Sequence, residues 1–367
     1  MSVKIGRIRG INIKLDYSWF LVFLFITWSL ANNYLPSQYP GKPGNFYWII
    51  GGVSALSLYL SILVHELAHS TIAKRSGLEI NNITLHFFGG VAQIDEESSD
   101  PGTEAYMAMV GPVTSIVIGG LFLALFYTLG VPDAVEAVLR YAGYVNVGLA
   151  LFNMLPAFPM DGGRVLRAIL WKRSGNLIRS TRTASTVSNV ISVVFMMIGF
   201  YGIFSTGSFD GLWLIFIGLF INSSSKMGLS QTIISEALGE MTVREIMTGE
   251  VRTVEADASI KRAVDEWFSV HKHQGYPVVE DGRLVGIITI EDIRNVDPKR
   301  RDSVSVRDVM KTRDELVTIS PDERASDALM LMSSSDVGRL PVVEEGKLVG
   351  IITRSDIGKT IQLRTEL

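Results

Sequence analysis

The stretch that decides the fold runs from residue 46 to residue 73 and reads FYWIIGGVSALSLYLSILVHELAHSTIA. A helix needs about 20 apolar residues to cross a membrane, and this stretch is longer than that. It nevertheless holds His65, Glu66 and His69 in its second half. Ionisable side chains in a spanning helix cost roughly 2.5–3.5 kcal/mol each on insertion scales, so three of them within five positions indicate a functional site.

The spacing of these three residues is that of a zinc site. On a helix, positions i and i+4 lie on one face, so His65 and His69 can present both imidazoles to the same ion. Two neutral imidazoles can hold zinc while Glu66 acts as general base toward a water, as in a metalloprotease. Because the chain has no cysteine, thiolate ligands and disulfides are excluded, and zinc must use His, Asp or Glu.

The composition separates the chain into two regions. Apolar residues make up 47% of the sequence, and the mean hydropathy is +0.29. The long apolar runs lie in residues 15–222, whereas residues 240–367 alternate short apolar strands with charged stretches. A net charge of −3 supplies no basic field for nucleic acid, which we exclude as a partner. We predict a membrane domain over residues 1–230 and two smaller domains over 240–300 and 301–367.

Six apolar segments are long enough, or nearly so, to span a membrane. Placing the N-terminus in the cytosol puts 13 of the 15 Lys and Arg of residues 1–226 on the cytosolic side, which satisfies the positive-inside rule. Six spans also return the C-terminal region to the cytosol. The segments are residues 15–34, 46–73, 106–131, 144–171, 186–204 and 211–223.

A catalytic zinc site usually has three protein ligands and an open position, so one more ligand is expected. Asp161 is the best candidate. It lies in a stretch whose two prolines and two glycines should break the fourth span, and irregular backbone at membrane depth must line protein or water. The alternative makes Asp161 an N-cap for the helix beginning at Gly162. The similar depth of His65, His69 and Asp161, judged from nearby Lys74 and Arg164, favours the ligand.

These two motifs together resemble the site-2 protease family, in which a His-Glu-x-x-His helix is completed by an Asn-x-x-Pro…Asp-Gly segment. The resemblance covers most of residues 45–175. It implies a zinc metalloprotease in which His65, His69 and Asp161 bind the metal and Glu66 is the catalytic base. It also implies that Asn153 lies near the reacting carbonyl.

Residues 83–94 are rich in β-forming side chains and are interrupted by Gly89 and Gly90, which predicts a membrane-associated hairpin. The family resemblance implies that this hairpin, including both glycines, approaches the active site. An exposed strand edge there could hold an unwound segment of a transmembrane protein substrate through main-chain hydrogen bonds. We leave His86 out of the ligand set, because it has no partner at metal-ligand spacing.

Residues 244–293 and 307–357 form an internal repeat. Residues 276–289, YPVVEDGRLVGIIT, match residues 340–353, LPVVEEGKLVGIIT, and each copy predicts a strand, a Gly-containing turn, a second strand and a helix. The pattern resembles the CBS domain, whose tandem pairs fold together. The resemblance implies an adenine nucleotide ligand (ATP, ADP or AMP) and a homodimer through the CBS pair.

In the CBS family a Thr and the Asp three residues later contact the ribose, which corresponds here to Thr289 with Asp292 and Thr353 with Asp356. The same residues would also form a plain helix cap, so the pair could be structural without any ligand.

The predicted fold is therefore a polytopic α-helical membrane protein of six transmembrane helices with a small β-hairpin, followed by a cytosolic α/β tandem CBS module. It would be a multi-pass protein of the cell membrane, in contact with lipid. The alternatives are a CBS-regulated ion transporter or channel, which would scatter ionisable residues over several spans, and an inactive receptor, which would tolerate loss of Glu66.

Overall fold

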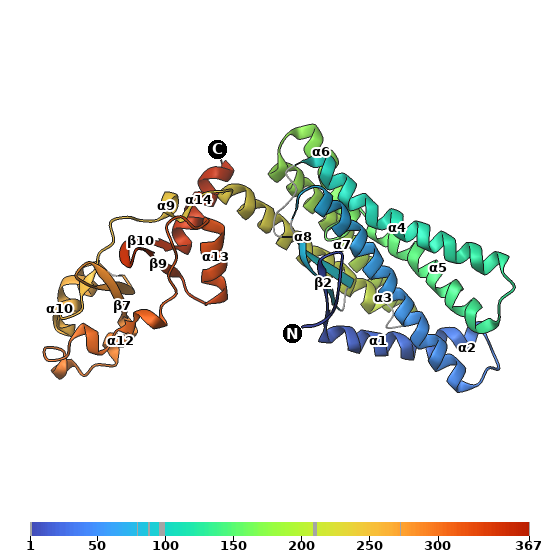
Figure 1. The fold of residues 1–367 in the computed structure, drawn as a ribbon, viewed down its shortest axis with the longest axis horizontal. Coiled ribbons are helices and arrows are strands. Elements are labelled where there is room, and N and C mark those ends of the chain that lie inside the picture. The colour runs from blue at the N-terminus through green and yellow to red at the C-terminus, as the bar shows by residue number, and fades with distance from the viewer. Residues whose placement is uncertain are drawn as a thin grey trace. The chain divides into compact units, whose positions relative to one another are not determined.

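The computed structural model describes residues 2–78, 80–86, 89–94, 100–207, 211–271 and 273–366. The chain divides into two compact units, Met1–Ser230 and Gln231–Leu367. Figure 1 shows the first unit as mostly long helices and the second as a mixture of short helices and strands.

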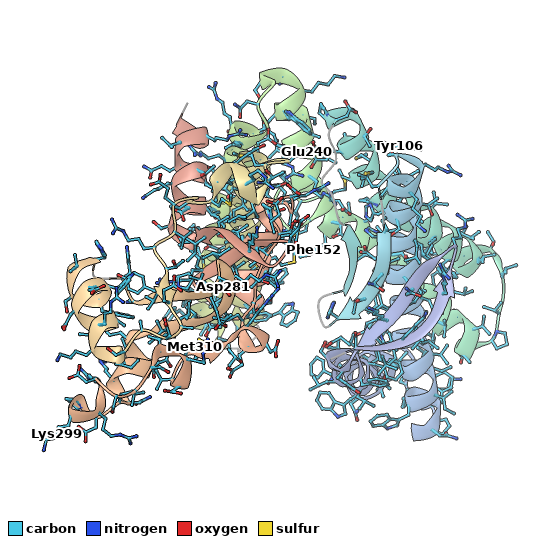
Figure 2. All side chains as sticks on the ribbon, turned by 60° about the vertical axis from the view of Figure 1, so that its left-hand side comes forward. Tyr106, Phe152, Glu240, Asp281, Lys299 and Met310 are labelled. Carbon is cyan, nitrogen blue, oxygen red and sulfur yellow. The ribbon has the colours of Figure 1, made fainter. Side chains whose placement is uncertain are left out.

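The first unit holds long helices with exposed apolar side chains. In the described part of the chain, five helical segments are long and apolar enough to cross a membrane: Tyr17–Gln38, Gly44–Arg75, Pro101–Thr128, Leu177–Ser205 and Gly211–Leu238. Tyr106 and Phe152 are among the exposed large apolar side chains (Figure 2), as expected of a surface that faces lipid instead of water. The helices of this unit are α1 (Tyr17–Ser29), a π-turn (Leu30–Tyr34), α2 (Leu35–Gln38), α3 (Gly44–Arg75), α4 (Pro101–Thr128), α5 (Asp133–Asn153), α6 (Asp161–Ser174), α7 (Leu177–Thr206) and α8 (Gly211–Leu238), of which the residues from Gln231 onward belong to the second unit.

The predicted count of six spans is not confirmed. The segment predicted as the fourth span, residues 144–171, is two helices, because α5 ends at Asn153 and α6 begins at Asp161. Prolines at 156 and 159 lack the backbone N–H that a continuing helix needs. With Glu136 and Arg140 in its sequence, α5 is not among the five apolar candidates.

A four-stranded sheet lies beside α3. Its strands are β1 (Ser2–Ile8), β2 (Ile11–Asp16), β3 (Ile80–His86) and β4 (Gly89–Ile94), in the order β1-β2-β3-β4. The predicted hairpin is β3 and β4, and β2 pairs with β3 in parallel. Ile11, Ile13 and Ile83 are buried in one cluster with Ile72 of α3 and Met107 of α4. Burial of this apolar face holds the sheet against the helices that carry the site.

The second unit contains the two predicted repeats. Its sheet has the order β5-β6-β7-β10-β9, with β8 paired to β7. The two hairpin turns, at Asp281–Gly282 and Glu345–Gly346, have positive φ at both residues, which is the turn that suits two-residue hairpins. The elements are α9 (Val243–Ile246), β5 (Val254–Glu255), α10 (Ile260–Ala263), a π-turn (Val264–Phe268), α11 (Ser269–His271), β6 (Gly275–Glu280), β7 (Arg283–Thr289), α12 (Ile290–Arg294), β8 (Lys311–Thr312), α13 (Ala325–Ser334), β9 (Arg339–Glu344), β10 (Lys347–Thr353) and α14 (Arg354–Glu366), with 3₁₀ turns at Pro298–Arg300, Val306–Asp308 and Arg313–Glu315.

Candidate functional site

Three side chains from two helices converge in the first unit. Nε2 of His65 lies 3.1 Å from Nε2 of His69. The same carboxylate oxygen of Asp161, Oδ2, lies 3.1 Å from Nε2 of His65 and 3.2 Å from Nε2 of His69. Both histidines are buried, with exposed fractions of 3% and 9%. Among the described residues, these three form the group that could hold a metal ion.

The local structure explains how the ligands meet. The i, i+4 spacing on α3 puts both imidazoles on one face, and α6 supplies Asp161 as its first residue. The N-cap of α6 is Met160, and no side chain caps this helix. Asp161 is therefore not the N-cap that the sequence left as an alternative, and its carboxylate is directed to the histidines instead.

The outer nitrogens of both rings have partners on α4. Nδ1 of His69 lies 2.6 Å from the carbonyl oxygen of Met107, and Nδ1 of His65 lies 2.9 Å from Oγ of Ser115. Because a carbonyl oxygen can only accept a hydrogen bond, Nδ1 of His69 must carry the hydrogen. In the neutral ring, Nε2 then carries a lone pair that can bind a metal ion. Such a partner on the outer nitrogen is the usual arrangement around metal-bound histidines.

The three inner atoms fit a zinc ion. Tetrahedral zinc with bonds of about 2.0–2.1 Å keeps its ligands about 3.3–3.4 Å apart, only slightly more than the separations here. Three acceptor atoms this close repel one another unless a cation or a shared proton lies between them. Two imidazoles and one carboxylate are also a known ligand set of catalytic zinc.

Gly111 of α4 leaves the space beside the two imidazoles. A Cβ atom at this position would come within 2.6 Å of Nε2 of His65 and closer still to Nε2 of His69. Only glycine lets α4 pass this near to both rings. A side chain here would occupy the position that the ion requires.

Glu66, the predicted base, lies beneath β4. A Cβ atom at Gly90 would overlap Cγ of Glu66 and would lie 3.0 Å from its carboxyl carbon. Gly90 therefore brings the backbone of β4 directly onto Glu66. Gly89 is its neighbour in the strand and pairs with His86 of β3.

The chain between α5 and α6 is held from two sides. The backbone N–H of Phe158 donates to Oγ of Ser188 on α7 at 2.8 Å, and Ala157 and Met160 are buried against Ile221 of α8. A Cβ at Gly162 would overlap the carbonyl oxygens of residues 154 and 155, so this glycine lets the chain fold back onto α6.

The predicted role of Asn153 stays a prediction. Asn153 is the last residue of α5 and is half-buried. It is not one of the three converging side chains.

The sequence interpretation missed the contribution of α4. Its buried positions include Glu104, Met107, Gly111, Ser115 and Gly119, which recur at helical spacing. That stripe of small and polar residues in an apolar helix was a readable signal, because such residues favour close helix contacts in membranes.

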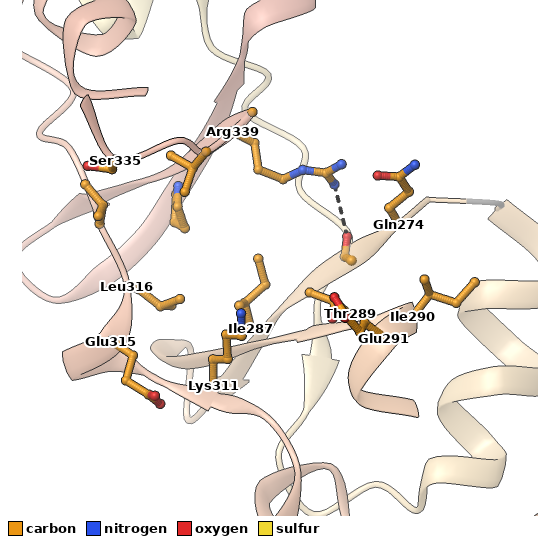
Figure 3. A pocket seen from close by; sticks show the side chains of 15 residues that line it. Gln274, Ile287, Thr289, Ile290, Glu291, Lys311, Glu315, Leu316, Ser335 and Arg339 are labelled. Carbon is orange, nitrogen blue, oxygen red and sulfur yellow. Dashed lines mark hydrogen bonds between the residues drawn. The ribbon is translucent and has the colours of Figure 1, made fainter. Parts of the chain in front are cut away.

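The second unit has a pocket with a volume of about 440 Å³ between the two repeats. Figure 3 shows Thr289 and Glu291 on one side of it and Glu315 and Leu316 on another. Arg339 also lines the pocket, and its Nη1 donates to the carbonyl oxygen of Gly275 at 3.4 Å (Figure 3). The remaining lining residues are Gln274, Ile287, Ile290, Lys311, Val317, Ser335, Val337, Gly338 and Pro341.

The pocket therefore combines apolar side chains with both signs of charge. Its acid Glu315 accepts the backbone N–H of Thr312 at 2.9 Å and also the Thr312 hydroxyl. These bonds, the backbone one first, hold the pKa of Glu315 below its ordinary value. Glu315 is thus a carboxylate near neutral pH, opposite in charge to Lys311 and Arg339.

Both predicted Thr and Asp pairs form helix caps. In the first repeat, Oδ2 of Asp292 accepts the backbone N–H of Thr289 at 2.8 Å and its hydroxyl at 2.7 Å. In the second, Oδ2 of Asp356 accepts the same two groups of Thr353 at 3.0 and 2.7 Å. Thr289 also lines the pocket, so a capping role and a ligand-binding role are compatible there.

Comparisons with known proteins point to the same two parts. Peptidase family M50 matches residues 53–135 and 130–199, and the CBS domain matches residues 243–299 and 306–362. A zinc metalloprotease of Methanocaldococcus jannaschii, MJ0392, is 32% identical over 371 residues, which cover 100% of this chain and 98% of that protein. Rip3 of Mycobacterium tuberculosis, which is named as a zinc metalloprotease, is 32% identical over 99% of this chain and 93% of its own. The solved site-2 protease of Methanocaldococcus jannaschii is 29% identical, with a TM-score of 0.45, over 62% of this chain and 94% of that one.

Proposed function

Because the chain belongs to peptidase family M50, the site-2 type of zinc metalloprotease, with a C-terminal CBS domain pair, we propose that it cuts peptide bonds within or next to transmembrane segments of membrane-anchored proteins. The observation that carries this proposal is the convergence of His65, His69 and Asp161 in an integral membrane protein. A hydrolytic centre on a spanning helix is reached by substrates that can themselves enter the bilayer. Membership of this protease family favours the metalloprotease over the transporter and receptor alternatives.

The residues of the site have separate roles in this proposal. Zinc held by His65, His69 and Asp161 would polarise the substrate carbonyl and make water more acidic. Glu66 takes the proton of the attacking water and passes it to the leaving nitrogen, so that it ends the cycle unchanged. Asn153 lies near the reacting carbonyl and donates its amide N–H to the oxygen as negative charge develops there.

Substrate would be held as an added strand. Because β4 ends the order β1-β2-β3-β4, one of its edges has no partner strand within the described sheet. An extended peptide that pairs with β4 near Gly89 and Gly90 has its main chain beside Glu66. A peptide bond in an intact helix is shielded by its own hydrogen bonds, so the substrate must unwind before it can bind in this way.

The proposal is tested by cleavage of a single-span model substrate with purified protein. Glu66→Gln keeps the shape of the side chain but cannot accept a proton, so we expect it to retain zinc and lose cleavage. A chelator should abolish cleavage by the unsubstituted protein, and added zinc should restore it. Cleavage that survives both the chelator and Glu66→Gln would rule out this chemistry.

Regulation by an adenine nucleotide is proposed for the CBS pair. The support is the pocket of about 440 Å³, which contains Thr289 and offers apolar side chains, two cations and two carboxylates. A nucleotide that binds there would alter the cleavage rate. Calorimetric titration with AMP, ADP and ATP tests this proposal in the unsubstituted full chain and in the Thr289→Val variant. Identical binding heats in the two proteins would mean that the nucleotide binds elsewhere.

The orientation in the membrane is also proposed. Most Lys and Arg of residues 1–226 lie at segment ends that the positive-inside rule assigns to the cytosol, so the N-terminus and the CBS pair would both be cytosolic. Two ends on one side need an even number of spans, so α5 would cross the membrane in addition to the five apolar segments. In sealed right-side-out vesicles, protection of the CBS pair from added protease would support this orientation. Digestion of the CBS pair in the same vesicles would indicate the opposite orientation.

A further inference from the structure

Helix α4 supplies no ligand to the candidate metal centre, yet one of its faces contacts both histidines and also Arg167 of α6. Met107 and Ser115 hold the outer nitrogens of the two histidines. Gly111, between them, leaves room for the ligand atoms. One turn before Met107, the same buried face ends in Glu104, whose exposed fraction is 1%.

Glu104 forms a buried ion pair with Arg167 of α6, the helix that begins with Asp161. Nε of Arg167 donates to Oε1 of Glu104 at 2.7 Å, and Nη2 of Arg167 contacts the same oxygen. Arg167 is 6% exposed, so it is not the water-facing cytosolic cation that the positive-inside count assumed. Its guanidinium also lies 5.6 Å from the ring centre of Phe158, in the segment that leads to Asp161.

Stability alone does not explain this pair. Oε2 of Glu104 has no hydrogen-bond partner among the residues that the structure describes. Replacing a buried ion pair by apolar residues of similar volume is often neutral or stabilising, whereas removing one partner leaves an uncompensated charge. A pair that is costly to break and directional in its hydrogen bonds does, however, fix the position of one helix along another.

We propose that Glu104 and Arg167 are positioning residues that fix α6 along α4, and thereby place Oδ2 of Asp161 within reach of the ion held by His65 and His69. The inference rests on the proposed metal site. It follows from the contacts of α4 with both other helices. Met107 and Ser115 of α4 bind the two histidines of α3, and Glu104 of α4 binds Arg167 of α6, the helix that begins with Asp161. Ligand distances tolerate errors of only about 0.2 Å, so a small slip of α6 is enough to weaken the site.

The test compares four variants of the ion pair with two reference variants, all in the full chain in detergent. Glu104→Gln and Arg167→Met each remove one charge, and the double variant Glu104→Leu with Arg167→Met replaces the pair by apolar side chains. Arg167→Lys keeps the charge but loses the second donor of the guanidinium. Arg173→Met is the matched control, because Arg173 is exposed in the last turn of the same helix. Asp161→Ala shows what loss of the ligand itself does.

The readouts are thermal unfolding, the dissociation constant for zinc in competition with a chelator, the visible spectrum of the cobalt-substituted protein, and the separate values of kcat and KM. We expect every folded variant of the pair to bind zinc at least tenfold more weakly, in the range of about 10–100-fold seen when outer partners of metal ligands are removed. The cobalt spectrum should shift toward that of Asp161→Ala, and KM should change less than twofold. Arg173→Met should match the unsubstituted protein.

The double variant and Arg167→Lys keep the test decisive if the single substitutions fail to fold. Zinc affinity and a cobalt spectrum that stay unchanged in either folded variant would overturn the positioning role. If Asp161→Ala itself left zinc binding unchanged, the proposed ligand set would be wrong instead, so the two failures are distinguishable.

Discussion

Replacing Gly111 by alanine should remove the metal centre while leaving the fold intact. The added Cβ would lie 2.6 Å from Nε2 of His65 and closer still to Nε2 of His69, whereas ordinary contacts begin near 3.4 Å, so α4 or the rings must move by at least about 0.8 Å. A misplacement of about 1 Å can cost about 100-fold in rate, and here the displaced atoms are the ligands themselves. We therefore expect loss of bound zinc and at least a 100-fold loss of cleavage.

The helix itself should not suffer from this substitution. Alanine is favoured over glycine in a helix interior by about 0.5–1 kcal/mol, so the backbone preference of α4 improves. Gly120→Ala is the matched control on the same helix, because its Cβ would meet no atom within 4 Å. Gly120→Ala should keep full zinc and full cleavage.

Metal analysis, cleavage of a model substrate and thermal unfolding of both variants complete this test. We expect Gly111→Ala to unfold near the temperature of the unsubstituted protein but to carry no stoichiometric zinc. One zinc per chain and unimpaired cleavage in Gly111→Ala would refute the close approach of α4 to the ligands.

Three further predictions concern the surroundings of the site and the CBS pair. The Cβ of Gly90→Ala would overlap Glu66, so kcat should fall about 100-fold while zinc is retained. Gly6→Ala is the control, because no atom lies within 4 Å of its Cβ. Equal cleavage rates in the two variants would contradict the placement of β4 on Glu66. Ser115→Ala removes the hydrogen-bond partner of Nδ1 of His65 and should weaken zinc binding about 10–100-fold, measured by competition with a chelator. An unchanged zinc affinity would show that Ser115 does not support His65 as a ligand. Asp292→Ala removes the carboxylate that accepts the backbone N–H of Thr289 in the capping box of α12, and should lower the free energy of unfolding by about 1 kcal/mol in denaturant without any nucleotide. An effect seen only with nucleotide present would argue against capping.

The convergence of His65, His69 and Asp161 could be predicted because the signals for it are local in the sequence. His65 and His69 are one helical turn apart, and the prolines and glycines around Asp161 predict a break in the helix. The CBS repeat was equally accessible, since the two copies carry nearly the same hairpin sequence.

The rest depends on contacts between distant parts of the chain. Strand β2 pairs in parallel with β3 some 70 residues later, as in Ile13 with Ile83, and no turn signal links them. Arg167 resembles any basic residue at the end of a span until its partner Glu104 is located on another helix. The fourth span was predicted over residues 144–171 with a break near Asp161, and the structure divides this stretch between α5 and α6. Glu136 and Arg140 lower the hydropathy of α5, which is not among the five apolar candidates.

Proteolysis within the membrane can be tested by locating the bond that is cut. A single-span substrate is digested by the purified protein in lipid bilayers, with Glu66→Gln as the control, and the product ends are identified by mass spectrometry. We expect new termini inside or at the edge of the transmembrane segment, and we expect them to be absent with Glu66→Gln. Cuts confined to the water-exposed loops, or the same termini with Glu66→Gln, would contradict it.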